Sequence, residues 1–370
     1  MGRALLNPLR GQLEADGAVW TEVRCALGEE SYEAALDFGD VVEEHRALRE
    51  SAALLDLSQR ETLTLTGRDR AKWLHGLCTQ QVKKLGELEG AYGCHINIKG
   101  KLLADLWVSN VGEMLVLDVE PGVGRALRRM LKGYKVSEDV TLLERSELFG
   151  SLGVVGPRAA AILTDQTGVE VSGLASGCVA LAEVAGVECM IVATPQFGPP
   201  GFRVTCLREQ LPEVWGALRA REVRPAGYEA QERARLRFGR PRFGADLSED
   251  LLFNEADLTD AVSFTKGCYL GQEVVERVDS RGSVGRRLLG LRFEDGESAL
   301  PAGGTPIRNA ERELGHVTSA AYLDDVGCVV ALAVIHRADN APGTVLEVGA
   351  AGASPRTAVV TERGAIVPQS

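Results

Sequence analysis

This sequence lacks three features that would indicate a cellular location or a metal site: a membrane span, a signal peptide and closely spaced cysteines. No apolar run approaches the roughly 18 residues that a membrane span needs, and residues 1–16 carry charges where a signal peptide has an apolar core. The eight cysteines include no Cys-x-x-Cys pair, so a zinc ribbon or a ferredoxin-type cluster has no sequence support. Scattered thiols fit a reducing compartment better than a disulfide framework. We therefore expect a cytoplasmic protein with no membrane segment and no metal site.

An excess of positive charge is also missing. The formal net charge is −11 over 370 residues, whereas proteins that bind nucleic acids or membrane surfaces usually present a cationic face. We therefore expect neither nucleic acid nor membrane among the direct partners. The hydrophobic content of 45% is that of an ordinary globular protein, and the length suggests about two or three domains.

Helical and strand patterns alternate in the first part of the chain. Apolar residues recur at helical spacing over residues 33–58, which predicts a helix there. Residues 61–66 alternate as Glu-Thr-Leu-Thr-Leu-Thr, a strand pattern, and Asp69 is placed to cap a helix running through Leu77. Further strands are predicted at 91–98, 102–109, 114–119 and 202–207, with amphipathic helices after Pro121 and around Pro212.

The pattern changes at about residue 285. Short β-like runs alternate from there with Gly/Pro-rich turns, and they cover 288–293, 315–319, 328–334, 344–348 and 357–361. Such spacing is typical of a small barrel or sandwich. The sequence therefore predicts an α+β region over residues 1–284 and a β domain over residues 285–370.

One segment reverses the acidic balance of the chain. Residues 221–242 hold seven arginines against three glutamates. Arginine forks suit carboxylates and phosphates, so a small anionic ligand is one interpretation. A solvated helix face is the other, because Arg233 and Arg237 are spaced for pairing with Glu229 and Glu232.

A second segment combines glycine with a cysteine. It reads Lys266-Gly-Cys-Tyr-Leu-Gly-Gln-Glu273. Gly267 and Gly271 permit close backbone approach or positive φ, which would place Cys268 on a shaped loop, and Lys266 could favour its thiolate. Gln272 and Glu273 could orient a substrate or relay a proton, or simply hold the loop. The alternative for Cys268 is the role of a small buried hydrophobe.

This segment resembles the signature motif of the YgfZ-type folate-binding proteins. The likeness continues through Arg281-Gly282 and Arg286-Arg287-Leu288. Other short pieces, in the right order, resemble the T protein of glycine cleavage, from Glu44-His45 near the start to Gly315-His-Val-Thr-Ser319 in the β domain. The resemblance covers roughly residues 40–362.

The resemblance implies a clover-leaf of α/β subdomains around a folate pocket, followed by a small β-barrel. It implies two interleaved subdomains in residues 1–284, with about 30 additional residues at the N-terminus. It also implies tetrahydrofolate, or a one-carbon derivative, as the cofactor. With the motif above, it assigns chemistry to Cys268, Lys266 and Asp105 and folate binding to Tyr92, Asn97, Arg235, Phe243, Gln272 and Glu273.

Three positions depart from the T-protein pattern. The T protein has an Asp-Asp pair where this chain has Ala104-Asp105, its pterin-gripping glutamate falls at Arg203, and the partner arginine falls at Gln231. A carboxylate beside the folate nitrogen is the expected acid/base and electrostatic group for aminomethyl transfer. Its loss argues against glycine-cleavage chemistry.

The resemblance therefore implies a folate-binding accessory protein that supports assembly or repair of iron–sulfur enzymes, including tRNA-modifying ones, with a reactive cysteine. Reduced folate and iron–sulfur enzymes or assembly proteins are its expected partners. Two alternatives stay open: a folate-dependent aminomethyltransferase of glycine cleavage or a related demethylation, and a non-enzymatic docking scaffold.

Overall fold

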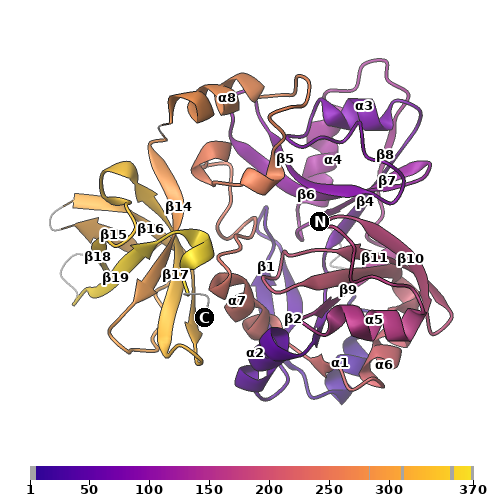
Figure 1. The fold of residues 1–370 in the computed structure, drawn as a ribbon, viewed down its shortest axis with the longest axis horizontal. Helices are drawn as coiled ribbons and strands as arrows, with labels where there is room; N and C mark the ends of the chain where they lie inside the picture. Colours follow the sequence, from indigo (N-terminus) through magenta and orange to yellow (C-terminus); the bar gives the residue numbers. More distant parts are fainter. Residues whose placement is uncertain (1–5, 283, 310–311, 351–353, 368–370) are drawn as a thin grey trace. The chain divides into compact units, whose positions relative to one another are not determined.

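The computed structural model describes residues 6–282, 284–309, 312–350 and 354–367. The chain forms two compact units, each drawn in Figure 1. The first comprises Met1–Asn97, Leu103–Gln231 and Asp260–Leu270, and the second comprises Ile98–Leu102, Glu232–Thr259 and Gly271–Ser370. None of the helices among the described residues is long and apolar enough to cross a bilayer.

A five-stranded sheet in the first unit carries several of the predicted strands. Its order is β5 (Gly90–Ile96), β6 (Leu102–Val111), β7 (Met114–Val119), β4 (Glu61–Thr66) and β8 (Thr141–Glu144). This confirms the strands predicted at 61–66, 91–98, 102–109 and 114–119. The accompanying helices are α3 (Arg70–His75) and α4 (Gly124–Lys132). Asp69 does not cap α3 through its side chain as predicted, because its carboxylate accepts a hydrogen bond from the Asp139 amide at 2.8 Å.

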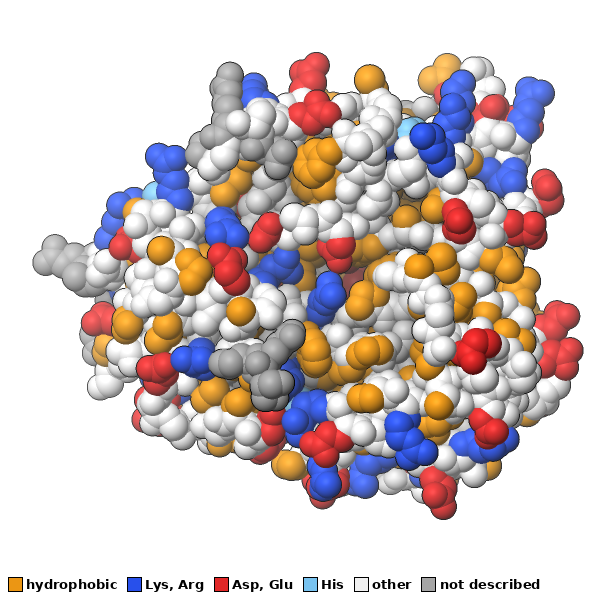
Figure 2. All heavy atoms as spheres, in the orientation of Figure 1, with side chains coloured by type: hydrophobic (Ala, Val, Ile, Leu, Met, Phe, Trp, Pro, Cys, Tyr) orange, Lys and Arg blue, Asp and Glu red, His pale blue; other side chains and the backbone are white. Residues whose placement is uncertain are grey.

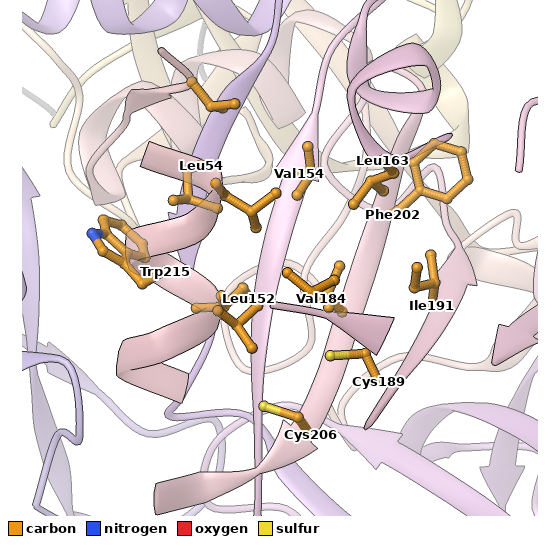
Figure 3. Close-up of a cluster of buried hydrophobic side chains, with 14 of the residues drawn as sticks. Leu54, Leu152, Val154, Leu163, Val184, Cys189, Ile191, Phe202, Cys206 and Trp215 are labelled. Carbon is orange, nitrogen blue, oxygen red and sulfur yellow. The ribbon is translucent and has the colours of Figure 1, made fainter. Parts of the chain in front are cut away.

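A six-stranded sheet in the same unit forms a large hydrophobic core with three helices. Its order is β10 (Val179–Val184), β11 (Val187–Ala193), β12 (Gly201–Leu207), β9 (Phe149–Val155), β3 (Ala53–Asp56) and β13 (Arg224–Pro225), with helices α1 (Arg10–Ala15), α5 (Ala159–Thr167) and α6 (Leu211–Arg219). Figure 3 shows Trp215 beside Leu54 and Leu152 in this core. The predicted strand at 202–207 and the helix after it are confirmed.

The helix predicted over residues 33–58 is wrong at both ends. Residues Ser31–Asp37 form β2, which pairs antiparallel with β1 (Val19–Arg24), and the helix α2 covers only Val41–Glu50. Gly39 at φ +95° turns the chain between the strand and the helix, and the Asp40 side chain caps α2 by accepting from the Glu43 amide at 3.1 Å. Apolar residues in β2 happened to continue the helical spacing.

The second unit contains a closed six-stranded barrel. Its order is β14 (Arg286–Phe293), β17 (Cys328–His336), β16 (Arg312–Leu323), β15 (Pro306–Asn309), β18 (Val345–Val348) and β19 (Arg356–Thr361). Leucine, valine, isoleucine and phenylalanine side chains fill it. The expected α+β fold with a C-terminal β-barrel is confirmed. The first barrel strand begins close to the expected boundary at 284/285, and the domain division itself stays a prediction.

The remaining helices are short. Helix α7 covers Tyr228–Arg237 and α8 covers Gln272–Arg281. Single 3₁₀ turns lie at η1 (Arg208–Gln210), η2 (Phe253–Glu255), η3 (Thr259–Ala261), η4 (Arg337–Asp339) and η5 (Arg363–Ala365).

Candidate functional site

Lys266 anchors the cysteine loop to a distant segment of the first unit. Its Nζ donates hydrogen bonds to the carbonyl oxygens of His75 (2.6 Å), Cys78 (2.5 Å) and Gln80 (2.9 Å). An ammonium has three donors, so these acceptors use all of them. Burial lowers the pKa of Lys266 to about 8, while the three carbonyl acceptors favour its charged form.

The other end of the loop is fixed as well. The Leu270 amide donates to the Gly76 carbonyl at 3.0 Å, and Gly271 adopts φ +79°. Gly267 has no positive φ, and a Cβ there would meet nothing closer than 4.0 Å. The backbone therefore requires glycine at Gly271, as expected, but not at Gly267. Between these fixed ends Cys268 is exposed, and it is the one exposed thiol among eight free cysteines. Its alternative role as a buried hydrophobe is therefore excluded.

His75 lies against the cysteine loop, which no local sequence pattern indicated. Its Nε2 is 4.0 Å from the place that a Cβ on Gly267 would take. Its Nδ1 accepts long hydrogen bonds from the amides of Val82 (3.4 Å) and Lys83 (3.5 Å). Burial, followed by the charge of Lys266, lowers the pKa of His75 to about 4. The ring is therefore neutral at physiological pH and carries its proton on Nε2, where it can donate a hydrogen bond.

Tyr92 and Asp105 form a pair on neighbouring strands of the five-stranded sheet. The Tyr92 hydroxyl donates to the Asp105 carboxylate at 2.9 Å. Burial, and then the nearby Glu120, raises the pKa of Asp105 to about 6, and burial raises the pKa of Tyr92 well above its usual value. Ala104 points to the opposite face of β6 and is fully buried. Of positions 104 and 105, Asp105 alone therefore offers Tyr92 a carboxyl group, and this group can exchange a proton near neutral pH.

Residues 75–80 contact both the cysteine loop and the strand that carries Tyr92. Thr79 donates its amide to the Cys94 carbonyl at 2.9 Å, two residues from Tyr92, and its hydroxyl donates to the Ala261 carbonyl at 2.5 Å. Residues 75–80 thus connect β5 with the segment that carries the cysteine loop. Of the residues assigned from sequence, the first unit brings Tyr92 together with Asp105.

Arg203 belongs to a buried charge cluster that joins the two sheets of the first unit. Asp118 accepts from Arg203 at 2.9 Å and from Arg60 at 2.6 Å, and Arg60 also pairs with Glu120. Burial lowers the pKa of Arg203 to about 10, although Asp118 opposes the shift. Two buried atoms in this cluster, Oδ2 of Asp118 and Nε of Arg203, have no hydrogen-bond partner among the described residues. An aspartate inside the apolar run Met114–Val119 was a sequence signal for this pairing that our sequence analysis missed.

Arg235 is held entirely by partners inside the second unit. It donates to Asp246 at 2.8 Å, to Glu232 at 2.6 Å and to the Ser319 hydroxyl at 2.9 Å, and only 3% of its side chain is exposed. Burial alone would raise the pKa of Glu232, but Arg235 and Arg242 outweigh it and lower that pKa to about 2. The charge of Arg235 is thus paired with carboxylates of the same unit.

The neighbouring arginines are also paired. Arg233 bonds to Asp324 and Arg237 to Asp325, both in the turn between β16 and β17. Arg221 pairs with Asp165 in the first unit. The basic segment is therefore largely neutralised by acidic residues of this chain.

The other assigned residues have separate surroundings. Asn97 is half-buried in the first unit. In the second unit Phe243 is buried, Gln272 donates to Glu276 at 2.6 Å, and Glu273 is exposed in the first turn of α8. The roles assigned to the site residues stay predictions.

The two parts of the chain match two successive family models. Residues 9–266 match the GCVT N-terminal domain, and residues 286–364 match the glycine cleavage T-protein C-terminal barrel domain. Among similar proteins, an aminomethyltransferase of Thermoanaerobacter sp. (strain X514) is 26% identical over 81% of this chain and 82% of its own length. An aminomethyltransferase of Listeria monocytogenes serotype 4b (strain F2365) is 29% identical over 85% of this chain and 86% of its own length.

A solved structure shows the same fold. The glycine cleavage system aminomethyltransferase T from Bartonella henselae superposes with a TM-score of 0.86 at 21% identity and covers 97% of both chains. Because the two matching models together span most of the sequence, in the order N-terminal domain and then barrel, this chain belongs to the glycine cleavage T-protein family.

Proposed function

We propose that this protein is a tetrahydrofolate-binding accessory protein of the YgfZ type, which works in the cytoplasm to support assembly or repair of iron–sulfur enzymes, tRNA-modifying enzymes among them. The observation that carries the proposal is the exposed Cys268 on a loop fixed at both ends by Lys266 and Leu270. A thiol that reacts with a partner must be accessible, and a fixed loop holds it in one position.

Tetrahydrofolate fits the first unit in part. The edge of a pterin ring carries both hydrogen-bond donors and an acceptor, and the unpaired Oδ2 of Asp118 and Nε of Arg203 supply one acceptor and one donor. Tyr92 and Asp105 would add a hydroxyl and a carboxyl group. Tetrahydrofolate supplies a carrier for a one-carbon unit when bound. With Arg203 in place of the T protein's glutamate, we expect the pterin to be held differently from the way the T protein holds it.

Aminomethyl transfer is the second candidate, favoured by the names of the relatives. The Asp105 carboxyl, with its pKa of about 6, could serve as an acid or base in such chemistry. Ala104 removes the other carboxylate, and loss of one electrostatic or acid/base group costs about 10²–10³ in rate. We therefore expect the purified protein not to form methylenetetrahydrofolate and ammonia from an aminomethylated carrier protein at ordinary enzyme rates.

A deletion strain tests the proposal directly. Iron–sulfur enzyme activities and glycine-cleavage flux are measured in the same strain, with and without the restored gene. We expect the iron–sulfur activities to fall and to recover with the gene, while glycine-cleavage flux stays unchanged. The opposite pattern would establish the aminomethyltransferase alternative.

Calorimetry with polyglutamylated tetrahydrofolate tests the cofactor. We expect saturable heat, and no heat at millimolar ligand would exclude folate binding. If folate binds, measuring whether it is chemically altered during incubation with a client enzyme separates a catalyst from a docking scaffold.

A further inference from the structure

Lysine is rare in this chain and is concentrated in one stretch of the sequence, whereas arginine occurs throughout. The chain has eight lysines against 33 arginines, and seven of the lysines fall within residues 72–135. The eighth is Lys266 itself. Elsewhere in the chain arginine is the basic residue, as in Arg10, Arg158 and Arg356.

The fold brings several of these lysines to the loop. Lys72 lines a cleft of about 560 Å³ together with Gly76 and Leu270, the residues that hold the far end of the loop. Lys83 and Lys84 act electrostatically on His75, whose Nε2 faces Gly267. Figure 2 shows Lys and Arg side chains gathered over the part of this face where Figure 1 draws α3. We call Lys72, Lys83 and Lys84 the lysine surface.

These lysines are available to a partner. All three side chains are exposed, and none forms an ion pair within the described parts of the chain. Most arginines of residues 221–242 are instead paired, among them those bonded to Asp246, Asp324 and Asp325. In a chain of net charge −11, unpaired cations collected at one place attract anions from solution.

The cleft beside the lysines is partly apolar. Its lining includes Trp73, Leu77, Tyr134 and Leu270, together with the acidic residues Asp69 and Glu138. Two residues before Lys266 in the chain, Phe264 is half exposed. Apolar side chains bordered by charges are typical of a protein-docking site. The two acidic residues would repel a continuous phosphate backbone, whereas a protein segment can place its carboxylates against the lysines and its apolar side chains in the cleft.

We propose that the lysine surface docks an acidic protein segment, and that this docking brings the partner's reacting group to Cys268. The inference rests on the proposed role of Cys268 and names the kind of partner it serves. The lysines supply long-range attraction and the cleft supplies contact area. The neutral Nε2–H of His75, which lies against the loop, can donate to a carboxylate that the lysines bring in.

The local potential at Cys268 can be measured with two thiol reagents. In a background of Cys25→Ala, Cys178→Ala and Cys328→Ala, Cys268 is the only thiol that is not buried. Its thiolate attacks one sulfur of an aromatic disulfide, a mixed disulfide forms, and the other half leaves as a coloured thiolate. Anionic dithiobis-nitrobenzoate and neutral dithiodipyridine report the same reaction with and without electrostatic attraction.

We expect Lys83→Glu with Lys84→Glu to lower the ratio of the anionic to the neutral rate by about ten-fold. The matched control is Arg24→Glu with Arg224→Glu, which makes the same change in net charge at two other exposed positions, and its ratio should stay within about two-fold of the parent. A ratio unchanged by the lysine substitutions would overturn the proposal.

Binding to labelled probes then identifies the partner class. We expect a fluorescein-labelled peptide of alternating Glu and Leu to bind the parent protein and to lose about ten-fold in affinity in the Lys83→Glu, Lys84→Glu variant. The proposal is overturned if the peptide does not bind, and also if single-stranded RNA binds more tightly than the peptide through the same lysines. Neither result touches the deletion-strain test of the proposed function, which uses the unaltered protein.

Discussion

The arginine segment and the surface around the cysteine loop both carry several basic residues, and the structure treats their charge in opposite ways. Most arginines of residues 221–242 face aspartates and glutamates of the same chain, and Asp246 beside Arg235 has a fully buried side chain. The lysines around residues 266–270 are left without such partners. A cluster of basic residues can thus pair with acidic residues of the same chain or attract a partner. Which of the two it does depends on whether the fold brings acidic residues next to it.

Arg235 gives the strongest test of internal pairing. Arg235→Met would leave Asp246 buried without its cation and Glu232 with Arg242 alone, and breaking a buried pair in this way costs about 3–5 kcal/mol. Urea unfolding measures the loss in the free energy of unfolding. The exposed Arg224→Met is the matched control and should cost under about 0.5 kcal/mol. If Arg235→Met kept full stability and lost only folate affinity, Arg235 would be a ligand-binding residue as the sequence suggested.

Lys266 tests the anchor of the loop. Lys266→Met leaves three carbonyl oxygens without their donor, and we expect a loss of about 3 kcal/mol in the free energy of unfolding. Hydrogen exchange should also quicken in residues 75–80. Lys72→Met, on the exposed surface, is the control. Unchanged stability combined with slower alkylation of Cys268 would instead favour the role of thiolate activator.

Asp105 gives a prediction that depends on pH. Its folded-state pKa of about 6 exceeds the unfolded value of 3.8, so the folded state binds more protons between these values and loses stability as pH rises through this window. Asp105→Asn removes that loss, and we expect it to stabilise the protein by about 1–3 kcal/mol at pH 8. The gain should shrink toward zero near pH 4. A variant destabilised equally at both pH values would show that the carboxylate is stabilising in its ionised form.

The fold was largely predictable because its strands have clear local patterns. β4 and β7 alternate or run apolar between turns, and the barrel strands lie between glycine-rich turns. β2 was misread because its apolar residues also fit a helical period, and only pairing with β1 makes it a strand. Local spacing carries no information on such pairing.

The candidate site was less predictable because its contacts join distant residues. Lys266 lies 186 to 191 positions from the carbonyls that it holds, and His75 meets the loop across a similar separation. The motif identified Cys268 as the residue to examine. Its exposure, the anchor at Lys266 and the unpaired lysines nearby required the structure.

Cys268 itself tests the central claim most directly. Cys268→Ala and Cys268→Ser are each scored for melting temperature and for rescue of iron–sulfur enzyme activity in the deletion strain, with Cys328→Ala as the matched control. Because the thiol is exposed, both variants should melt within about 2 °C of the parent. We predict that both fail to rescue while Cys328→Ala rescues fully. A stable Cys268→Ala that rescues fully would contradict the account.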